Sequence, residues 1–350
     1  MLFAKKTKGY CLEFGEQTTL LARLSGEEAP LVVEELREFP AADVEGLKQY
    51  LKTAEGKGPT GFAHARCGIF PAKRIVRRHT LDPKRTKEPG YFQEIFSQQF
   101  RIEPDKYSIV TLNAADGGEY DSGKATQKEV IFCGLPTEEI VATQDSLLGT
   151  GIYPEYLELT SVAMLGGLVS YLKFKQNSTP LLLLEMGYEA TQSYILSADG
   201  LDISRPIPSG ISSMIPVVQK ELGLKDEESA RKLFYSNTFD FTSMGGTLIK
   251  KLLKELQSSI GFYEVQTGQS ISCVLCLHLP PNLGWLSTTI AGSLGVSVFK
   301  LDLLPWLEFL GIRFADGVTP PTADDRWLGL FSLMASYNHA PASTVIDAKK

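Results

Sequence analysis

The chain has 350 residues, of which 43% are apolar and 22% charged, with a formal net charge of −6. This length predicts two lobes rather than one core, and the acidic balance excludes general nucleic-acid binding, which needs a basic surface. No window contains the roughly 18 uninterrupted apolar residues of a membrane helix, and no apolar stretch typical of a signal peptide follows the start MLFAKKTKGY.

The first predicted element is a hairpin. GYCLEFG reads as a strand, Glu16 and Gln17 form a turn, and TTLLARLS returns as a second strand. The same pattern recurs in PLLLLEMG, a turn at Tyr188 and Glu189, and TQSYILSADG. At one offset the matched pairs are Glu13 and Glu185, Gly15 and Gly187, and Thr19 and Thr191. Such a match indicates either a duplicated fold or chance, because glycine-containing hairpin turns are common.

Between the hairpins, residues 73–87 hold seven Lys or Arg and one acid, Asp82. We interpret this stretch as a solvated strand and turn, with docking to an anionic membrane or an acidic partner as the alternative. A helix is predicted in EPGYFQEIFSQQF, with an apolar stripe that is expected to be core rather than interface. The stripe consists of Phe92, Ile95, Phe96 and Phe100.

Strands and helices then alternate. Strands are predicted in KYSIVTLNA and KEVIFCGL, and Pro136 opens an amphipathic helix that Gly149 and Gly151 close. YLELTSVAMLGGLVSYL reads as a strand that runs into a buried helix. The second half predicts helices in ISSMIPVVQKELGL and EESARKLFY, followed by a long helix from about Thr247.

The remaining segments are a strand in ISCVLCLHL, a helix in GWLSTTIAGSLG, a strand in VSVFKLDLL and a final helix in DDRWLGLFSLMASY. Cys273 and Cys276 have the C-x-x-C spacing, but residues three apart on a strand point to opposite faces. No second pair completes a zinc site, and the four histidines are dispersed. We therefore predict core cysteines, reduced as in a cytosol, and no metal site.

The order of these elements resembles the actin-like ATPase superfamily, specifically the PilM proteins of type IV pilus assembly, which are related to FtsA. The segments that carry the resemblance are GYCLEFGEQTTLLARLS, GLPTEEIVATQDSLLGTGIYPEYLELTSVAML, LLLLEMGYEATQSYILSADGLDISRPIPSG and LLKELQSSIGFYEVQTG. The resemblance implies an α/β bilobal actin-like (ribonuclease-H-like, duplicated) fold with a small subdomain inserted in the first lobe.

It also implies domain boundaries. The first lobe is expected at 1–174 with the inserted subdomain at about 82–155, and the second lobe at 178–326 with a smaller subdomain at about 210–245. A C-terminal helix at 327–338 and a disordered tail at 339–350 complete the chain.

In this family the two hairpins close on the phosphates of a nucleotide from opposite lobes, and an acid at each strand end holds Mg²⁺ through water. The resemblance therefore implies a set of candidate nucleotide-binding residues. They are Glu13, Gly15, Thr18, Thr19, Glu185, Gly187, Glu189, Thr191 and Gly210.

The sequence departs from the family pattern at several of these places. Glu13 and Glu185 replace Asp, and Glu16 and Gln17 replace turn serines, so that a carboxylate faces the phosphates. His278-Leu279-Pro280 stands where the family has glycines, Ser258 replaces an Arg, and the Arg-to-Gly-Gly turn survives only as Arg205 and Ser209-Gly210. We expect weak or lost nucleotide binding, with no cofactor rather than ATP and Mg²⁺, and no catalytic residue.

Three functions follow from the resemblance. The first is a cytoplasmic scaffold of a pilus or type II secretion platform that binds the tail of a PilN-like membrane protein in a groove between the inserted subdomain and the first lobe. Other platform components would be partners, a homo-oligomer is left open, and association with the inner membrane would be through the partner. The alternatives are an active ATPase and, as the weakest, a sugar kinase, for which Glu158 stands at the position of an Asp.

Overall fold

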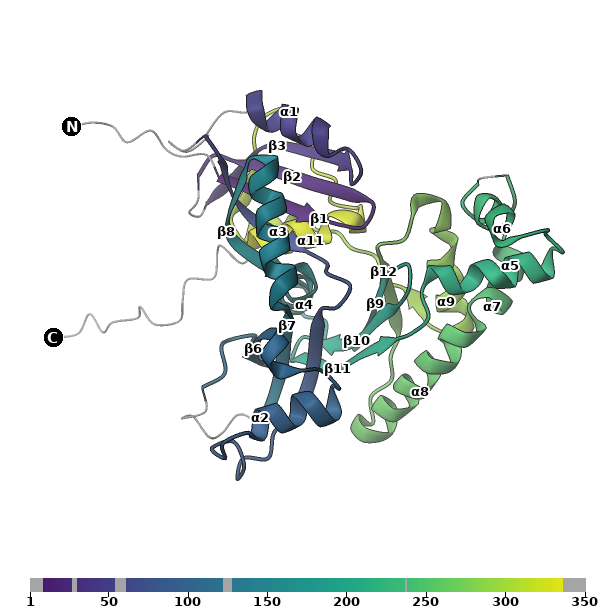
Figure 1. Ribbon diagram of the computed structural model, residues 1–350. Helices are drawn as coiled ribbons and strands as arrows, with labels where there is room; N and C mark the ends of the chain where they lie inside the picture. The colour runs from purple at the N-terminus through teal and green to yellow at the C-terminus, as the bar shows by residue number, and fades with distance from the viewer. Residues whose placement is uncertain (1–8, 27–29, 54–60, 122–127, 237, 336–350) are drawn as a thin grey trace, which may run out of the picture.

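The computed structural model describes residues 9–26, 30–53, 61–121, 128–236 and 238–335 (Figure 1). Within these ranges the strands form three sheets. In Figure 1 the first sheet lies at the upper left, the second near the centre, and the third at the lower left.

The first sheet contains the first predicted hairpin and has the strand order β14-β3-β2-β1-β4-β8. Its strands are β1 (Gly9–Phe14), β2 (Thr18–Leu24), β3 (Leu31–Pro40), β4 (Ala63–Ile69), β8 (Ile152–Leu159) and β14 (Ile312–Phe314). β1 pairs antiparallel with β2, and β2 with β3, whereas β4 and β8 continue from β1 in parallel. Strand β1 is apolar on both faces because helices cover the sheet from both sides.

The second sheet contains the second hairpin and has the order β11-β10-β9-β12-β13. Its strands are β9 (Leu181–Met186), β10 (Thr191–Ser197), β11 (Gly200–Ile207), β12 (Cys273–Leu277) and β13 (Ser297–Val298). Two antiparallel pairings again precede two parallel ones. The sheet therefore repeats the β3-β2-β1-β4-β8 pattern, which confirms the bilobal α/β fold and shows that the two hairpins are equivalent parts of its halves.

The third sheet has the order β5-β7-β6 and is antiparallel. Its strands are β5 (Ile75–Thr80), β6 (Tyr107–Asn113) and β7 (Glu129–Pro136), and it is covered by α2 (Tyr91–Glu94) and a π-helical turn (Ile95–Gln99). The rings of Phe96 and Phe100 lie 5.0 and 5.7 Å from that of Phe132. The predicted aromatic stripe is therefore the core of this small subdomain, as expected.

Helices fill the space around the sheets. They are α1 (Val44–Thr53), α3 (Thr137–Thr150), α4 (Thr160–Phe174), α5 (Ile215–Glu221), α6 (Glu227–Phe234), α7 (Gly245–Leu248), α8 (Lys250–Thr267), α9 (Trp285–Leu294), α10 (Leu304–Phe309) and α11 (Leu328–Ala335). Helices α4 and α11 pack closely because Gly167 has no Cβ to collide with Ser332. One apolar cluster runs through them and joins Leu20 of the first sheet to Leu183 of the second.

Two sequence predictions are wrong in part. The strand expected in VSVFKLDLL is limited to Ser297–Val298, because Leu303 is buried outside the sheet and α10 begins at Leu304, with Pro305 in its first turn. The stretch 73–87 is a strand and turn as predicted but is solvated only in part, because the side chain of Arg74 is only 11% exposed and pairs with a buried acid of the second lobe. The predicted disordered tail at 339–350 lies outside the described residues.

Candidate functional site

The two hairpin turns face each other between the lobes. The Gly15 N–H donates to the Thr18 carbonyl at 2.9 Å, and the Gly187 N–H donates to the Ala190 carbonyl at 3.1 Å. A Cβ added to Gly187 would lie 3.5 Å from Glu16 Oε1, so the side chain of the first turn reaches the backbone of the second. The structure thus brings the matched glycines to one place.

The strand-end acid of the first hairpin, Glu13, is 4% exposed. Its Oε2 has no hydrogen-bond partner among the residues that the structure describes, and it lies against the backbone of Gly329 in α11, where a Cβ would collide with it. Burial, together with the nearby Glu185, raises the pKa of Glu13 to about 8. At neutral pH this carboxyl group is therefore mostly protonated and uncharged.

The strand-end acid of the second hairpin, Glu185, is 1% exposed. The protein engages its Oε2, whereas its Oε1 has no hydrogen-bond partner among the described residues. Its Oε2 accepts from Arg74 at 2.7 Å, from Ser161 at 2.9 Å and from Tyr194 at 3.4 Å. The same guanidinium donates to Ser161 at 2.8 Å. Although burial lowers the pKa of Arg74, the adjacent Glu185 raises it overall, so Arg74 stays charged. An internal cation therefore neutralises Glu185.

The hydroxyl and turn residues of the predicted site are mostly used within the fold. Thr191 is fully buried and donates to the Ser209 carbonyl at 2.7 Å, whereas exposed Glu189 accepts from Ser212 at 3.2 Å. Gly210 is needed because a Cβ there would collide with the backbone of the second turn. The N–H groups of Ile211 and Ser212 then donate to the Gly187 and Tyr188 carbonyls at 3.1 and 2.8 Å. In the first hairpin, Thr19 is buried and Thr18 half-buried.

The segment after β12 is filled by side chains, as the sequence predicts. His278 adopts a left-handed backbone conformation with φ of 63°. Its ring lies 4.3 Å from that of Phe70 in the first lobe, and burial lowers its pKa to about 4. A neutral imidazole and a phenyl ring thus occupy the space between the lobes at this point.

An open depression of about 800 Å³ remains at the mouth of the cleft, and Glu16, Gln17, Tyr188, Ile211, Tyr235, Pro280, Pro281 and Asn282 line it. Within the described part of the chain, no Lys or Arg lines it, and Glu16 is its one charged residue. A triphosphate there would face the Glu16 carboxylate with no cation in the lining, the Arg231 guanidinium lying behind the Tyr188 ring at 5.7 Å from its centre. Together with the protonated Glu13 and the Arg74-bound Glu185, these residues do not fit Mg-ATP.

A second concave site lies between α3 and the first lobe, with a volume of about 480 Å³. Its floor is apolar and includes Phe14, Phe39, Leu47 and Ile69. Asp43 and Glu139 lie on its edges, and α3 contributes Ala142, Thr143 and Ser146. Thr19 is the one residue of this lining that the sequence offered as a candidate site residue, because the groove is built from segments that are far apart in the chain.

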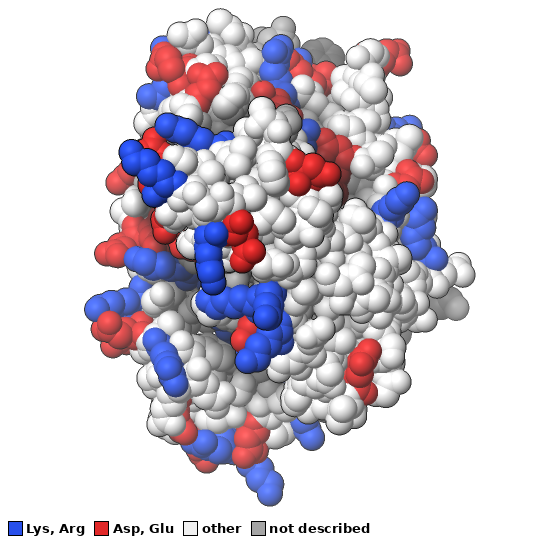
Figure 2. Space-filling view, turned by 90° about the vertical axis from the view of Figure 1, so that its right-hand side faces the viewer, with Lys and Arg blue, Asp and Glu red and all other residues white. Residues whose placement is uncertain are grey.

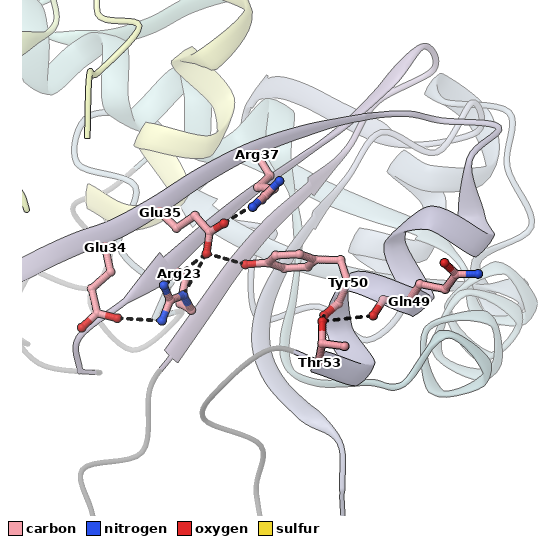
Figure 3. A network of polar contacts seen from close by, with 7 residues as sticks. All are labelled: Arg23, Glu34, Glu35, Arg37, Gln49, Tyr50 and Thr53. Atoms are coloured by element: carbon pink, nitrogen blue, oxygen red, sulfur yellow. Dashed lines mark hydrogen bonds and ion pairs between the residues drawn. The ribbon is translucent and has the colours of Figure 1, made fainter. Parts of the chain in front are cut away.

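A polar network holds α1 against the first sheet beside this groove (Figure 3). The Tyr50 hydroxyl of α1 donates to Glu35 Oε2 of β3 at 2.9 Å, and Arg23 and Arg37 pair with the same carboxylate. Burial and this hydrogen bond raise the pKa of Tyr50 to about 12. The network fixes the wall that α1 forms.

The other predicted candidates have structural partners. Cys273 and Cys276 are buried in the cores on opposite faces of the second sheet, as predicted. Glu158 pairs with Arg66 at 3.0 Å, and Arg205 pairs with Glu255 at 2.6 Å. Among the described residues, no cluster of His, Cys, Asp or Glu could hold a metal ion, and no helix is long and apolar enough to cross a bilayer.

No protein-family model matches the sequence, and no curated protein matches it. Among solved structures, the chain matches one chain of a PilM–PilN type IV pilus biogenesis complex at 17% identity, with a TM-score of 0.65, over 95% of this chain and 99% of that one. It also matches a protein of unknown function with an actin-like ATPase fold from Bacteroides thetaiotaomicron, at 8% identity over 94% and 96% of the two chains, with a TM-score of 0.46.

A third match is the cytoplasmic domain of EpsL, an inner-membrane component of the type II secretion system of Vibrio cholerae, at 6% identity over 95% and 96%, with a TM-score of 0.42. The TM-scores of the last two matches are too low to support an argument. The first match agrees with the strand order of both sheets. The chain therefore has a bilobal actin-like fold, shared with the matched chain of the PilM–PilN complex.

Proposed function

We propose that this protein is a scaffold of a type IV pilus-like or type II secretion-like assembly platform. It binds the N-terminal cytoplasmic tail of a PilN-like single-pass membrane protein, and it is held at the inner membrane through this partner. The observation that carries the proposal is the apolar groove between α3 and the first lobe. The fold shared with a chain of the PilM–PilN complex supports it.

The chemistry of the groove suits such a tail. Its apolar floor can take one or two apolar anchors, and the acids Asp43 and Glu139 at its edges favour basic residues. Segments on the cytoplasmic side of a membrane helix are enriched in Lys and Arg. Lys73 lies 3.4 Å from Glu139 and neutralises part of its charge, so Asp43 is the stronger attraction for a basic residue.

The scaffold acts without bound nucleotide. Arg74 supplies the positive charge next to Glu185 that Mg²⁺ would otherwise supply, and it comes from the opposite lobe. The pair therefore links the lobes without a ligand. An active ATPase is the alternative, but the Glu16 carboxylate in a lining without Lys or Arg and the ring of His278 count against it.

The test is binding of a synthetic peptide to the full chain, measured by calorimetry. The peptide copies the cytoplasmic tail of a single-pass membrane protein encoded beside this gene. Ala142→Arg places a long cation in the groove and is expected to weaken binding at least tenfold. Gln144→Arg is the matched control, since Gln144 is also exposed on α3 but does not line the groove.

Two results would contradict the proposal. One is an absence of peptide binding by the unaltered chain, and the other is equal weakening by both substitutions. The second result would mean that added positive charge on α3 repels the basic peptide without any contact in the groove.

A further inference from the structure

A second groove lies on the other lobe, between α5 and α8, with a volume of about 890 Å³. Its apolar part consists of Pro216, Val217, Leu248 and Leu253, which are exposed or half-buried except for Leu248. Figure 2 looks onto the side of the molecule that carries these helices, and Lys and Arg side chains gather near its centre beside a largely uncharged surface.

Four lysines line this groove from both walls. Lys220 belongs to α5, whereas Lys250, Lys251 and Lys254 belong to α8, and all four are exposed. Glu221 is the one acid among the lining residues. No ion pair joins any of these lysines to another described residue; Lys251 Nζ instead donates to the Pro208 carbonyl at 3.1 Å. On a chain of net charge −6, the groove is a local concentration of uncompensated positive charge.

This arrangement opposes the stability of α8. The first turn of this 18-residue helix contains Lys250 and Lys251 and no acid. The N-terminus of a helix carries a partial positive charge, so lysines there are unfavourable. The effect is small in α8, because α7 runs into it through Ile249, whose N–H donates to the Gly245 carbonyl at 3.0 Å. Lys250 and Lys254 are also like charges four residues apart, which repel each other on a helix. The Pro208 carbonyl compensates Lys251 in part, but no described acid pairs with Lys250 or Lys254, and a local arrangement that costs stability points to a functional use.

We infer that this groove binds an acidic segment of a partner protein that also carries apolar anchors. The carboxylates pair with lysines on both walls, and the anchors cover Pro216, Val217 and Leu253. This site is separate from the α3 groove and does not depend on the proposed function. If both exist, the protein joins a basic tail on one lobe to an acidic segment on the other.

The shape of the site favours a peptide over other anions. A membrane presents a flat surface, whereas these lysines flank a channel whose floor is apolar. Inorganic phosphate or a nucleotide would use the lysines but would leave the exposed apolar floor uncovered. A peptide segment with alternating acidic and apolar side chains satisfies both parts of the groove.

The test begins with a display library of random twelve-residue peptides selected on the immobilised full chain. Peptides enriched in Asp or Glu together with apolar residues are expected, and the best of them is measured by fluorescence anisotropy. Lys250→Glu/Lys254→Glu should weaken its binding at least tenfold. Lys128→Glu/Lys300→Glu makes the same change in net charge at exposed positions elsewhere, and it should change the affinity less than twofold.

Loss of folding should not explain the expected result, because Lys250 and Lys254 are exposed and form no ion pair with a described residue, and unchanged melting temperatures of both double variants check this. The inference is overturned if acidic peptides are not enriched, or if the two double variants weaken binding equally. It is also overturned if Lys250→Glu/Lys254→Glu reduces co-sedimentation of the protein with vesicles that contain phosphatidylglycerol but does not reduce peptide binding. Binding of the tail peptide in the α3 groove should remain unchanged in both variants, which separates this test from that of the proposed function.

Discussion

Glu13→Gln should change how the stability of the protein depends on pH. The substitution keeps the shape of the side chain and removes its ability to ionise. The folded state holds Glu13 at a pKa of about 8, against an ordinary value of 4.5. Because the pKa is raised on folding, the folded chain binds a proton that the unfolded chain releases. Glu13 therefore favours folding less and less as the pH rises from about 4.5 to about 8.

The size of this effect follows from the same values. One tenfold change in proton affinity corresponds to about 1.4 kcal/mol. For a carboxyl group with these two pKa values, the free energy of unfolding should fall by about 3 to 4 kcal/mol between pH 5 and pH 8. The Gln variant lacks this contribution. Relative to the unaltered chain, it should therefore gain the same amount over this interval.

The assay is urea unfolding followed by far-ultraviolet circular dichroism and tryptophan fluorescence, at pH values from 5 to 8. Comparing the variant with the unaltered chain at each pH cancels the contributions of other titrating groups. Glu45→Gln removes an exposed carboxylate in α1 and serves as the control. The difference in the free energy of unfolding between this variant and the unaltered chain should be nearly the same at every pH. If the difference in the free energy of unfolding between Glu13→Gln and the unaltered chain is also constant from pH 5 to pH 8, Glu13 is ionised in the folded state. The argument from burial would then fail.

Three further predictions concern the cleft. Gly329→Ala should destabilise the chain by about 2 kcal/mol or more because its Cβ collides with Glu13 Oε2. The double variant Gly329→Ala/Glu13→Ala should regain part of this stability, and thermal melts of both variants measure the effect. Arg74→Met should lower the free energy of unfolding in urea by about 3 to 5 kcal/mol because it leaves Glu185 buried and unpaired. Arg74→Met/Glu185→Gln should lower it clearly less, and equal losses for the two variants would contradict the ion pair. Millimolar Mg-ATP should leave the melting temperature unchanged, and a rise of several degrees would contradict the proposed loss of nucleotide binding.

Local patterns in the sequence predicted the hairpins because each needs only a few neighbouring residues. Apolar runs ending at Gly15 and Gly187 are enough to place two strands and a turn. The sequence pattern does not predict the strands and helix between Leu31 and Ile69, since apolar and polar residues alternate weakly in β3 and four of its ten residues are charged. The strand pairing that defines the duplicated fold was reached through the family resemblance and not through any local pattern.

The candidate site was harder to predict because its decisive contacts join distant positions. Arg74 and Glu185 are 111 residues apart, and in the sequence Arg74 is one of seven cations in a charged stretch. Composition gives no reason to choose it from the others as the one that enters the cleft. Similarly, the lysines of the α5–α8 groove come from two helices about thirty residues apart, and each helix alone looks like an ordinary solvated surface.

The two strand-end acids reveal how the cleft balances its charge. Two carboxylates brought close together in a buried site cannot both remain ionised without nearby positive charge. Arg74 provides one guanidinium, which hydrogen-bonds to Glu185 and not to Glu13. Glu13 is left to take up a proton, because its burial and, to a smaller extent, the nearby Glu185 raise its pKa to about 8. A divalent cation could have compensated both acids and could also have left the cleft. A guanidinium compensates one acid and is covalently fixed to the first lobe. On the proposed function, the lobes of this protein therefore hold one arrangement without a ligand, and the two grooves stay in place for protein partners.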